Sequence, residues 1–174
     1  SLPPTTPSQN VPCFVEGQKL LTADGFKSVE KLSENDKICT SDGRYVTFKL
    51  YKTHISKADT HTAPYHIPAH TFKHNVPSKP ITLSPLHAIQ IGKGLWHIPK
   101  YAALSYKSIS QVGIGKPITY YHVELPNYFT DNIVLDGNTI VESFAANQTR
   151  GIRNVYKYNS QIGGFTRKSL NATA

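Results

Sequence analysis

Three Asp-Gly dipeptides constrain the fold of this 174-residue chain more than any other feature of its sequence. They occur at Asp24-Gly25, Asp42-Gly43 and Asp136-Gly137, each between two short runs that contain apolar residues. Asp-Gly is favoured in two-residue hairpin turns, because both residues tolerate the positive φ that such turns require. Since many other short runs of this kind lie close together, the sequence predicts an all-β fold built from short strands.

Length and composition are those of one globular domain. Hydrophobic residues make up 39% of the chain and charged residues 17%, and a domain of this size buries a core without disulfides. No apolar run is long enough to span a membrane. The two cysteines and eight histidines show no metal-ligand spacing, so no metal site is predicted. The sequence assigns no cellular compartment.

The formal net charge of +8 raises the question of an anionic partner. Lys and Arg are scattered singly through most of the chain, which is typical of a solvated surface, so nucleic acid is a disfavoured partner. A basic β-domain that binds an anionic polymer stays open as an alternative. Positive charge is concentrated only near the C-terminus, at Arg150, Arg153, Lys157, Arg167 and Lys168.

Composition divides the chain into three segments. Residues 1–12 are rich in proline and polar residues and are interpreted as a flanking segment. The strand pattern begins at Cys13 and continues to Phe144. Residues 145–174 form a basic C-terminal extension, which we expect to pack poorly or to need a partner.

Three blocks of residues suggest chemistry. The first runs from Cys13-Phe14-Val15-Glu16-Gly17 through Thr22-Ala23-Asp24-Gly25, Val29-Glu30-Lys31-Leu32 and Asp36-Lys37-Ile38; the second is Leu83-Ser84-Pro85-Leu86-His87-Ala88; the third is Tyr121-His122-Val123-Glu124-Leu125 with Val141-Glu142-Ser143-Phe144. In this order the blocks resemble the Hint (hedgehog/intein) domain family. The last block is similar to that of Hint-like domains ending in Glu-Ser, not to the His-Asn of splicing inteins.

The resemblance implies an all-β, pseudo-twofold horseshoe of intertwined strands over residues 13–144. It also implies a site in which Cys13 is the nucleophile and the Pro12–Cys13 bond is cut. A thiol is a good nucleophile, and attack on its own preceding carbonyl is intramolecular. His87 is the candidate for protonating the leaving amine. Ser84 and Thr82 would bind or twist the scissile peptide through their hydroxyls, and backbone N–H groups would stabilise the oxyanion.

Three further residues are possible acid/base or supporting groups. His122 lies in the closing block, where it could approach the junction or make a structural hydrogen bond. Asp131 could carry a proton or cap a turn. The resemblance to hedgehog-type domains points loosely to Asp59, between the Cys and His blocks. Sterol transfer is nevertheless disfavoured, because no apolar extension follows Phe144.

The predicted function is therefore self-processing without splicing. Ser143 stands where a splicing intein has Asn and has no amide to cyclise, so the second cleavage is not expected. The N-terminal flanking polypeptide would be the substrate, and water or another small nucleophile the acyl acceptor. No cofactor is expected, because nucleophile, acid/base and substrate belong to one chain. A slow or inactive Hint fold that serves as a structural module of a larger protein stays open, since Pro12 crowds the attacked carbonyl.

Overall fold

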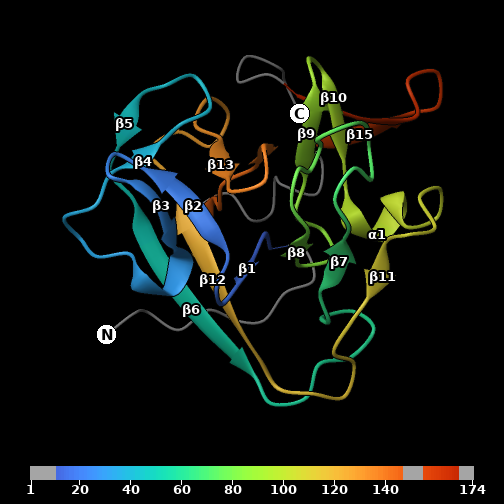
Figure 1. Cartoon of the computed structure of the whole chain (residues 1–174), viewed down its shortest axis with the longest axis horizontal. Coiled ribbons are helices and arrows are strands. Elements are labelled where there is room, and N and C mark those ends of the chain that lie inside the picture. The colour runs from blue at the N-terminus through green and yellow to red at the C-terminus, as the bar shows by residue number, and fades with distance from the viewer. Residues whose placement is uncertain (1–10, 147–154, 169–174) are drawn as a thin grey trace.

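The computed structural model describes residues 11–146 and 155–168 (Figure 1). Most of the predicted flanking segment lies outside the described residues, as do residues 147–154 and 169–174 of the basic extension. Within the described ranges the chain is almost entirely β, which confirms the fold class predicted from the sequence. The named helical segments are a 3₁₀ helix at Val29–Lys31 and the short helix α1 at Pro99–Ala102.

The strands form two sheets with antiparallel pairing between neighbours. The six-stranded sheet has the order β11 (Ser110–Gln111), β7 (Tyr65–Ile67), β8 (Ile81–Leu83), β1 (Phe14–Val15), β12 (Ile118–Glu124) and β6 (Lys49–Ile55). The ten-stranded sheet has the order β15 (Tyr156–Asn159), β16 (Gly164–Arg167), β10 (Leu95–His97), β9 (Ile89–Gly92), β14 (Thr139–Val141), β13 (Ile133–Leu135), β2 (Lys19–Thr22), β4 (Ile38–Cys39) and β5 (Tyr45–Val46), with β3 (Gly25–Ser28) beside β2.

All three Asp-Gly dipeptides lie in hairpins, as the sequence predicts. They connect β2 to β3, β4 to β5 and β13 to β14. Gly137 shows why glycine is required in the last of these turns. Its φ is +122°, and a Cβ there would lie 3.3 Å from the carbonyl oxygen of Lys79. A side chain at this position would therefore be strained and crowded.

Strand β1 lies in the middle of the six-stranded sheet, between β8 and β12 (Figure 1). Phe14 is paired with Leu83 on one side and with Tyr121 on the other. Paired strands in an antiparallel ladder run in opposite directions, so the residue before Phe14 lies beside the residue that follows Leu83 and beside the residue that follows Tyr121. This register therefore brings Cys13 next to Ser84 and His122, which are far from it in sequence.

The main core connects the two sheets. Its fully buried side chains are aliphatic for the most part, and many come from β2, β4, β8, β9 and β13, among them Leu20, Ile38, Ile81, Leu83, Ile89, Ile133 and Leu135. A second, smaller cluster encloses the start of β1 and consists of Val11, Cys13, Tyr120 and Phe144. The chain around Cys13 is thus embedded in apolar packing before any chemistry is considered.

Residues 155–168 form a hairpin that packs on the domain, so the expectation of a poorly packed extension is wrong for this part. Strand β15 pairs with β16, and β16 joins the sheet where Phe165 pairs with Trp96 of β10. The approach is close at Gly164, where a Cβ would lie 2.6 Å from Leu95 Cδ1 and 2.9 Å from the Trp96 carbonyl oxygen. The sequence signal that was missed is this glycine next to an aromatic residue.

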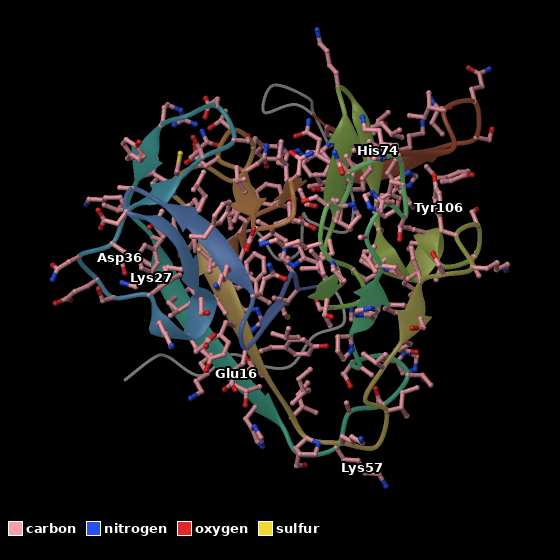
Figure 2. All side chains as sticks on the ribbon, viewed as in Figure 1. Glu16, Lys27, Asp36, Lys57, His74 and Tyr106 are labelled. Carbon is pink, nitrogen blue, oxygen red and sulfur yellow. The ribbon has the colours of Figure 1, made fainter. Side chains whose placement is uncertain are left out.

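Charged side chains lie mostly at the surface (Figure 2). The ion pair between Lys27 Nζ and Asp36 Oδ2, 2.8 Å apart, lies beside β3, and Tyr106 and His74 lie on the other side of the molecule.

Among the described residues, no helix combines the length and the apolar character needed to cross a membrane.

We predict that Leu135→Ala lowers the free energy of unfolding by about 2–5 kcal/mol, because Leu135 is fully buried and its truncation leaves a cavity. Urea denaturation followed by tryptophan fluorescence measures the loss. Leu104→Ala is the matched control, since Leu104 is 70% exposed, and it should change stability by less than roughly 0.5 kcal/mol. Equal losses in the two variants would contradict the assignment of the core.

Candidate active site

The thiol of Cys13 is enclosed in the second apolar cluster. The residue is 3% exposed and contacts Val11, Tyr120 and Phe144 in that cluster. Burial raises the pKa of the Cys13 thiol far above its usual range; a hydrogen bond with Ser84 opposes this effect, and the charge of Glu142 adds to it. The thiol is therefore protonated at neutral pH, and it donates a hydrogen bond to the Val11 carbonyl oxygen at 3.1 Å.

Ser84 lies against both sides of the Pro12–Cys13 bond. Its Oγ accepts a hydrogen bond from the Cys13 backbone N–H at 2.9 Å and donates one to the Val11 carbonyl oxygen at 3.3 Å. Its own N–H donates to the Cys13 carbonyl oxygen at 3.3 Å. Ser84 follows the last residue of β8, and the pairing of Phe14 with Leu83 places it there. Ser84 thus contacts the Pro12–Cys13 peptide bond, the bond that the sequence predicts to be cut.

His122 approaches the carbonyl of the same peptide bond. Its Nδ1 lies 3.2 Å from the Pro12 carbonyl oxygen, and its Nε2 lies 3.1 Å from Thr53 Oγ1. Burial lowers the pKa of His122, with the Pro12 carbonyl opposing the shift, so the ring is neutral at pH 7. If the Thr53 hydroxyl donates to Nε2, the single ring proton sits on Nδ1 and is directed at the Pro12 oxygen.

His87 lies on the far side of Cys13 and is fully buried. Its Nδ1 is 3.0 Å from the Cys13 carbonyl oxygen and its Nε2 is 2.9 Å from the Glu142 carbonyl oxygen. Burial lowers the pKa of His87 to about 4, although both carbonyls favour the charged ring. A neutral imidazole has one N–H and satisfies one of the two oxygens, whereas the imidazolium would satisfy both. The Cys13 backbone N–H donates its hydrogen bond to Ser84, whereas the His87 ring contacts the Cys13 carbonyl oxygen.

Glu142 holds the segment that carries His87. One carboxylate oxygen accepts the Ala88 N–H at 2.6 Å, and the other accepts the Tyr128 hydroxyl at 2.5 Å. Burial raises the pKa of Glu142 to about 7, opposed by these hydrogen bonds and by the charge of Arg167. Because the Glu142 backbone oxygen also contacts His87, this one residue fixes the histidine through both its main chain and its side chain.

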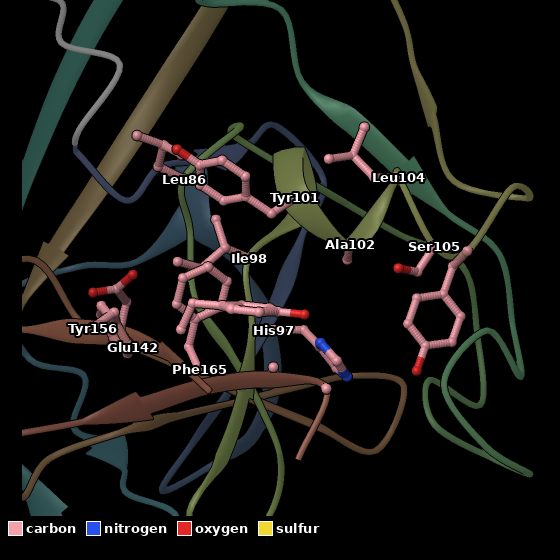
Figure 3. A pocket seen from close by; sticks show the side chains of 14 residues that line it. Leu86, His97, Ile98, Tyr101, Ala102, Leu104, Ser105, Glu142, Tyr156 and Phe165 are labelled. Carbon is pink, nitrogen blue, oxygen red and sulfur yellow. The ribbon is translucent and has the colours of Figure 1, made fainter. Parts of the chain in front are cut away.

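A cavity of about 670 Å³ lies on the other side of Glu142, between α1 and the C-terminal hairpin (Figure 3). Several aromatic side chains line it, among them His97, Tyr101, Tyr156 and Phe165. Figure 3 shows the Glu142 carboxylate next to Tyr156, at the edge of this space. Glu142 therefore lies between the cavity and the segment that carries His87.

Three predicted residues make their contacts elsewhere. Thr82 Oγ1 lies 3.4 Å from His66 Nδ1. The exposed Asp59 carboxylate accepts hydrogen bonds from the His61 and Thr62 backbone in its own turn. Asp131 is buried and forms an ion pair with Arg44 at 2.7 Å; it also accepts the Asn127 N–H, which fits the turn interpretation.

Sequence analysis missed several residues of this site. Thr53 and Glu142 provide hydrogen bonds to the two histidine segments, and Phe144 packs against the His122 ring with centroids 5.2 Å apart. Glu142 and Phe144 were visible as parts of the closing block, but only as substitutes for other residues. No local signal distinguishes Thr53 from other threonines. In the described part of the chain, no group of three or more His, Cys, Asp or Glu side chains is arranged to hold a metal ion.

A family model identifies the family of this chain, and a solved structure shares its fold. A family model described as Hint domain matches residues 12–148. A solved bacterial intein-like domain from Clostridium thermocellum is similar in fold, with a TM-score of 0.54 and 13% identity over 75% of this chain and 98% of that one. A splice-inactive variant of the AceL NrdHF class 3 split intein gives a TM-score of 0.48 and 14% identity over 76% and 98%. No curated protein matches the chain.

Two buried serines offer a matched test of the hydrogen bonds in the site. Ser84 Oγ bonds to Cys13 and Val11, whereas Ser143 Oγ is the buried side-chain polar atom without a partner among the described residues. We predict that Ser84→Ala lowers the free energy of unfolding by about 1–3 kcal/mol, and that Ser143→Ala leaves it unchanged or raises it. Urea denaturation measures both. A larger loss for Ser143→Ala than for Ser84→Ala would contradict these assignments.

Proposed function

Because the chain belongs to the Hint domain family across residues 12–148, we propose that it is a self-processing domain that cleaves its own Pro12–Cys13 peptide bond through a thioester. One observation carries the proposal. The carbonyl oxygen of Pro12 lies 3.2 Å from a neutral histidine, and the nitrogen of Cys13 lies 2.9 Å from a buried serine hydroxyl. Both polar atoms of one peptide bond, next to a buried thiol, thus have side-chain partners.

The first step is an N-to-S acyl shift. Cys13 Sγ attacks the Pro12 carbonyl carbon, and negative charge develops on the Pro12 oxygen. The Nδ1–H of His122 points at this oxygen and would stabilise the charge, since a donor aligned beforehand needs no reorganisation. Thr53 Oγ1 lies 3.1 Å from Nε2, where it can donate to that nitrogen and leave the ring proton on Nδ1. In this proposal a side chain takes the role that the sequence analysis expected of backbone N–H groups, and that expectation stays a prediction.

The second requirement is a proton for the leaving amine. As the C–N bond breaks, the Cys13 nitrogen gains one proton while the thiol loses one, so the shift is neutral overall. Ser84 Oγ accepts the N–H of the scissile bond, and its hydroxyl favours the thiolate form of Cys13, which suits it to pass the proton between them. His87 holds the Cys13 carbonyl on the other side of the bond. A proton received by His87 would be stabilised by both of its carbonyl neighbours.

A second nucleophile then cleaves the thioester. Water, a small thiol or an amine attacks the Pro12 carbonyl, the C–S bond breaks, and the nucleophile's proton returns to the Cys13 sulfur. The chain before Cys13 is released and the domain regains its thiol. Splicing is not part of this proposal, because Ser143 has no side-chain amide to cyclise and Glu142 is committed to holding Ala88.

A slow or inactive domain that acts as a structural module is the alternative. The observation that favours it is the Cys13 thiol itself, whose pKa burial raises and which therefore remains protonated. The crowded carbonyl of Pro12 acts in the same direction. The first experiment below separates the two functions.

We predict that a fusion carrying an N-terminal tag releases a fragment ending at Pro12, and that hydroxylamine or thiol accelerates release because either nucleophile drains the thioester. Intact mass spectrometry over hours to days follows both fragments. Cys13→Ala should abolish release, whereas Cys39→Ala, the matched control at the other cysteine, should leave it intact. An unchanged mass in every condition would favour the structural module.

We predict that His122→Ala slows cleavage by roughly 10²–10³-fold, because it removes the donor aimed at the Pro12 oxygen. His54→Ala is a close control, since His54 Nδ1 contacts Thr119 Oγ1 at 3.0 Å on the same strand pair but is exposed. Its rate should match the wild type. Rates come from the hydroxylamine-driven time course, and equal rates in the two variants would rule out this role of His122.

A further inference from the structure

The C-terminal hairpin contributes a guanidinium group to the surroundings of Glu142. Arg167 lies in β16, directly opposite Tyr156 of β15. Its two terminal nitrogens donate to Asn132 Oδ1 and to the Phe129 carbonyl oxygen, each at 2.9 Å. Four elements of structure thus meet at this side chain: both strands of the hairpin, the Phe129 loop and the start of β13.

Aromatic rings enclose the guanidinium. Its central carbon lies 4.3 Å from the centre of the Trp96 ring and 5.5 Å from that of Tyr128. Such cation–π contacts favour a desolvated arginine and fix its orientation. Two hydrogen bonds and two ring contacts therefore fix the position of Arg167. A solvated surface arginine makes fewer contacts with the protein.

Hydrogen bonds connect the hairpin to the Glu142 carboxylate. The Tyr156 hydroxyl lies 3.1 Å from the Tyr128 hydroxyl, and the Tyr128 hydroxyl donates to Glu142 Oε1 at 2.5 Å. The charged group that faces Glu142 from the hairpin is Arg167, and it opposes the burial that raises the pKa of Glu142. From the other elements, the Tyr128 hydroxyl and the Ala88 N–H of the His87 segment contact the carboxylate, and the charge of Glu142 acts on the Cys13 thiol.

We propose that Arg167, with Tyr156, is a positioning residue for self-cleavage: the C-terminal hairpin keeps the Glu142 carboxylate charged, and the carboxylate thereby holds Ala88 and the His87 ring against Cys13. This inference rests on the proposed function. A carboxylate is a stronger acceptor than a neutral carboxyl group for the Ala88 N–H and the Tyr128 hydroxyl. When Glu142 takes up a proton, the segment carrying His87 is held less firmly.

The sign of the pH effect follows from the charges. Arg167 lowers the pKa of Glu142 from the value that burial alone would set. Removing the positive charge raises this pKa, so Glu142 becomes protonated at a higher pH. The rate of cleavage, which requires the charged carboxylate, should then fall off at a higher pH than in the wild type.

The test compares the pH profile of hydroxylamine-driven cleavage in wild type, Arg167→Met, Arg167→Lys and Lys157→Met. Lys157 is an exposed cation of the same hairpin. In Arg167→Met the acidic limb should move to higher pH, with the rate approaching wild type at high pH. Arg167→Lys should restore part of the shift, and Lys157→Met should match the wild type. A rate reduced equally at every pH, or not reduced, would overturn the proposal.

A second measurement does not depend on cleavage. In the Cys13→Ala background the chain stays whole, and ¹³C NMR of the Glu142 carboxyl carbon gives its titration midpoint. Arg167→Met should raise this midpoint and Lys157→Met should not; an unchanged midpoint overturns the inference. If the wild type never cleaves, the proposed function fails and the positioning role fails with it. If the wild type cleaves and the Arg167→Met profile is unshifted, the inference alone fails.

Discussion

The pairing of β1 with β8 and β12 is the constraint on which the site depends. One register, Phe14 against Leu83 and Tyr121, carries Cys13 to Ser84 on one side and to His122 on the other. A slip of one residue would turn Phe14 out of the core and remove both polar partners from the junction. The apolar packing of Phe14 therefore specifies the geometry of the reacting bond, and its ring also packs against His87 at 4.7 Å.

Burial moves the ionisable groups of the site toward their neutral forms. The thiol of Cys13 holds its proton, the pKa values of both histidines fall, and that of Glu142 rises. Such a site suits a reaction in which a proton is passed over a short distance without a change in total charge. It also explains why the hydroxyl groups of Ser84 and Thr53 matter, because neutral donors and acceptors carry no desolvated charge.

The parts of the structure that could be predicted are those with a local or a motif signal. Asp-Gly turn chemistry specifies its hairpins within a few residues, and the blocks around Cys13 and His87 carry recognisable spacing. Thr53 and Arg167 could not be found in this way, because their partners are contributed by pairing across strands: Thr53 reaches His122 over 69 residues. Asp59 was suggested by its position between the Cys and His blocks. Its carboxylate instead accepts hydrogen bonds from backbone N–H groups of its own turn.

The place of the hairpin in chain order has a consequence for timing. A chain emerges from the ribosome N-terminus first, so the segment before Cys13 emerges before β16. If Arg167 and Tyr156 complete the support of Glu142, a nascent chain that still lacks them has an unfinished site. The bond at Pro12 would then stay intact until the hairpin has been synthesised and folded, so the flanking segment would be released only after residues 13–168 have been made.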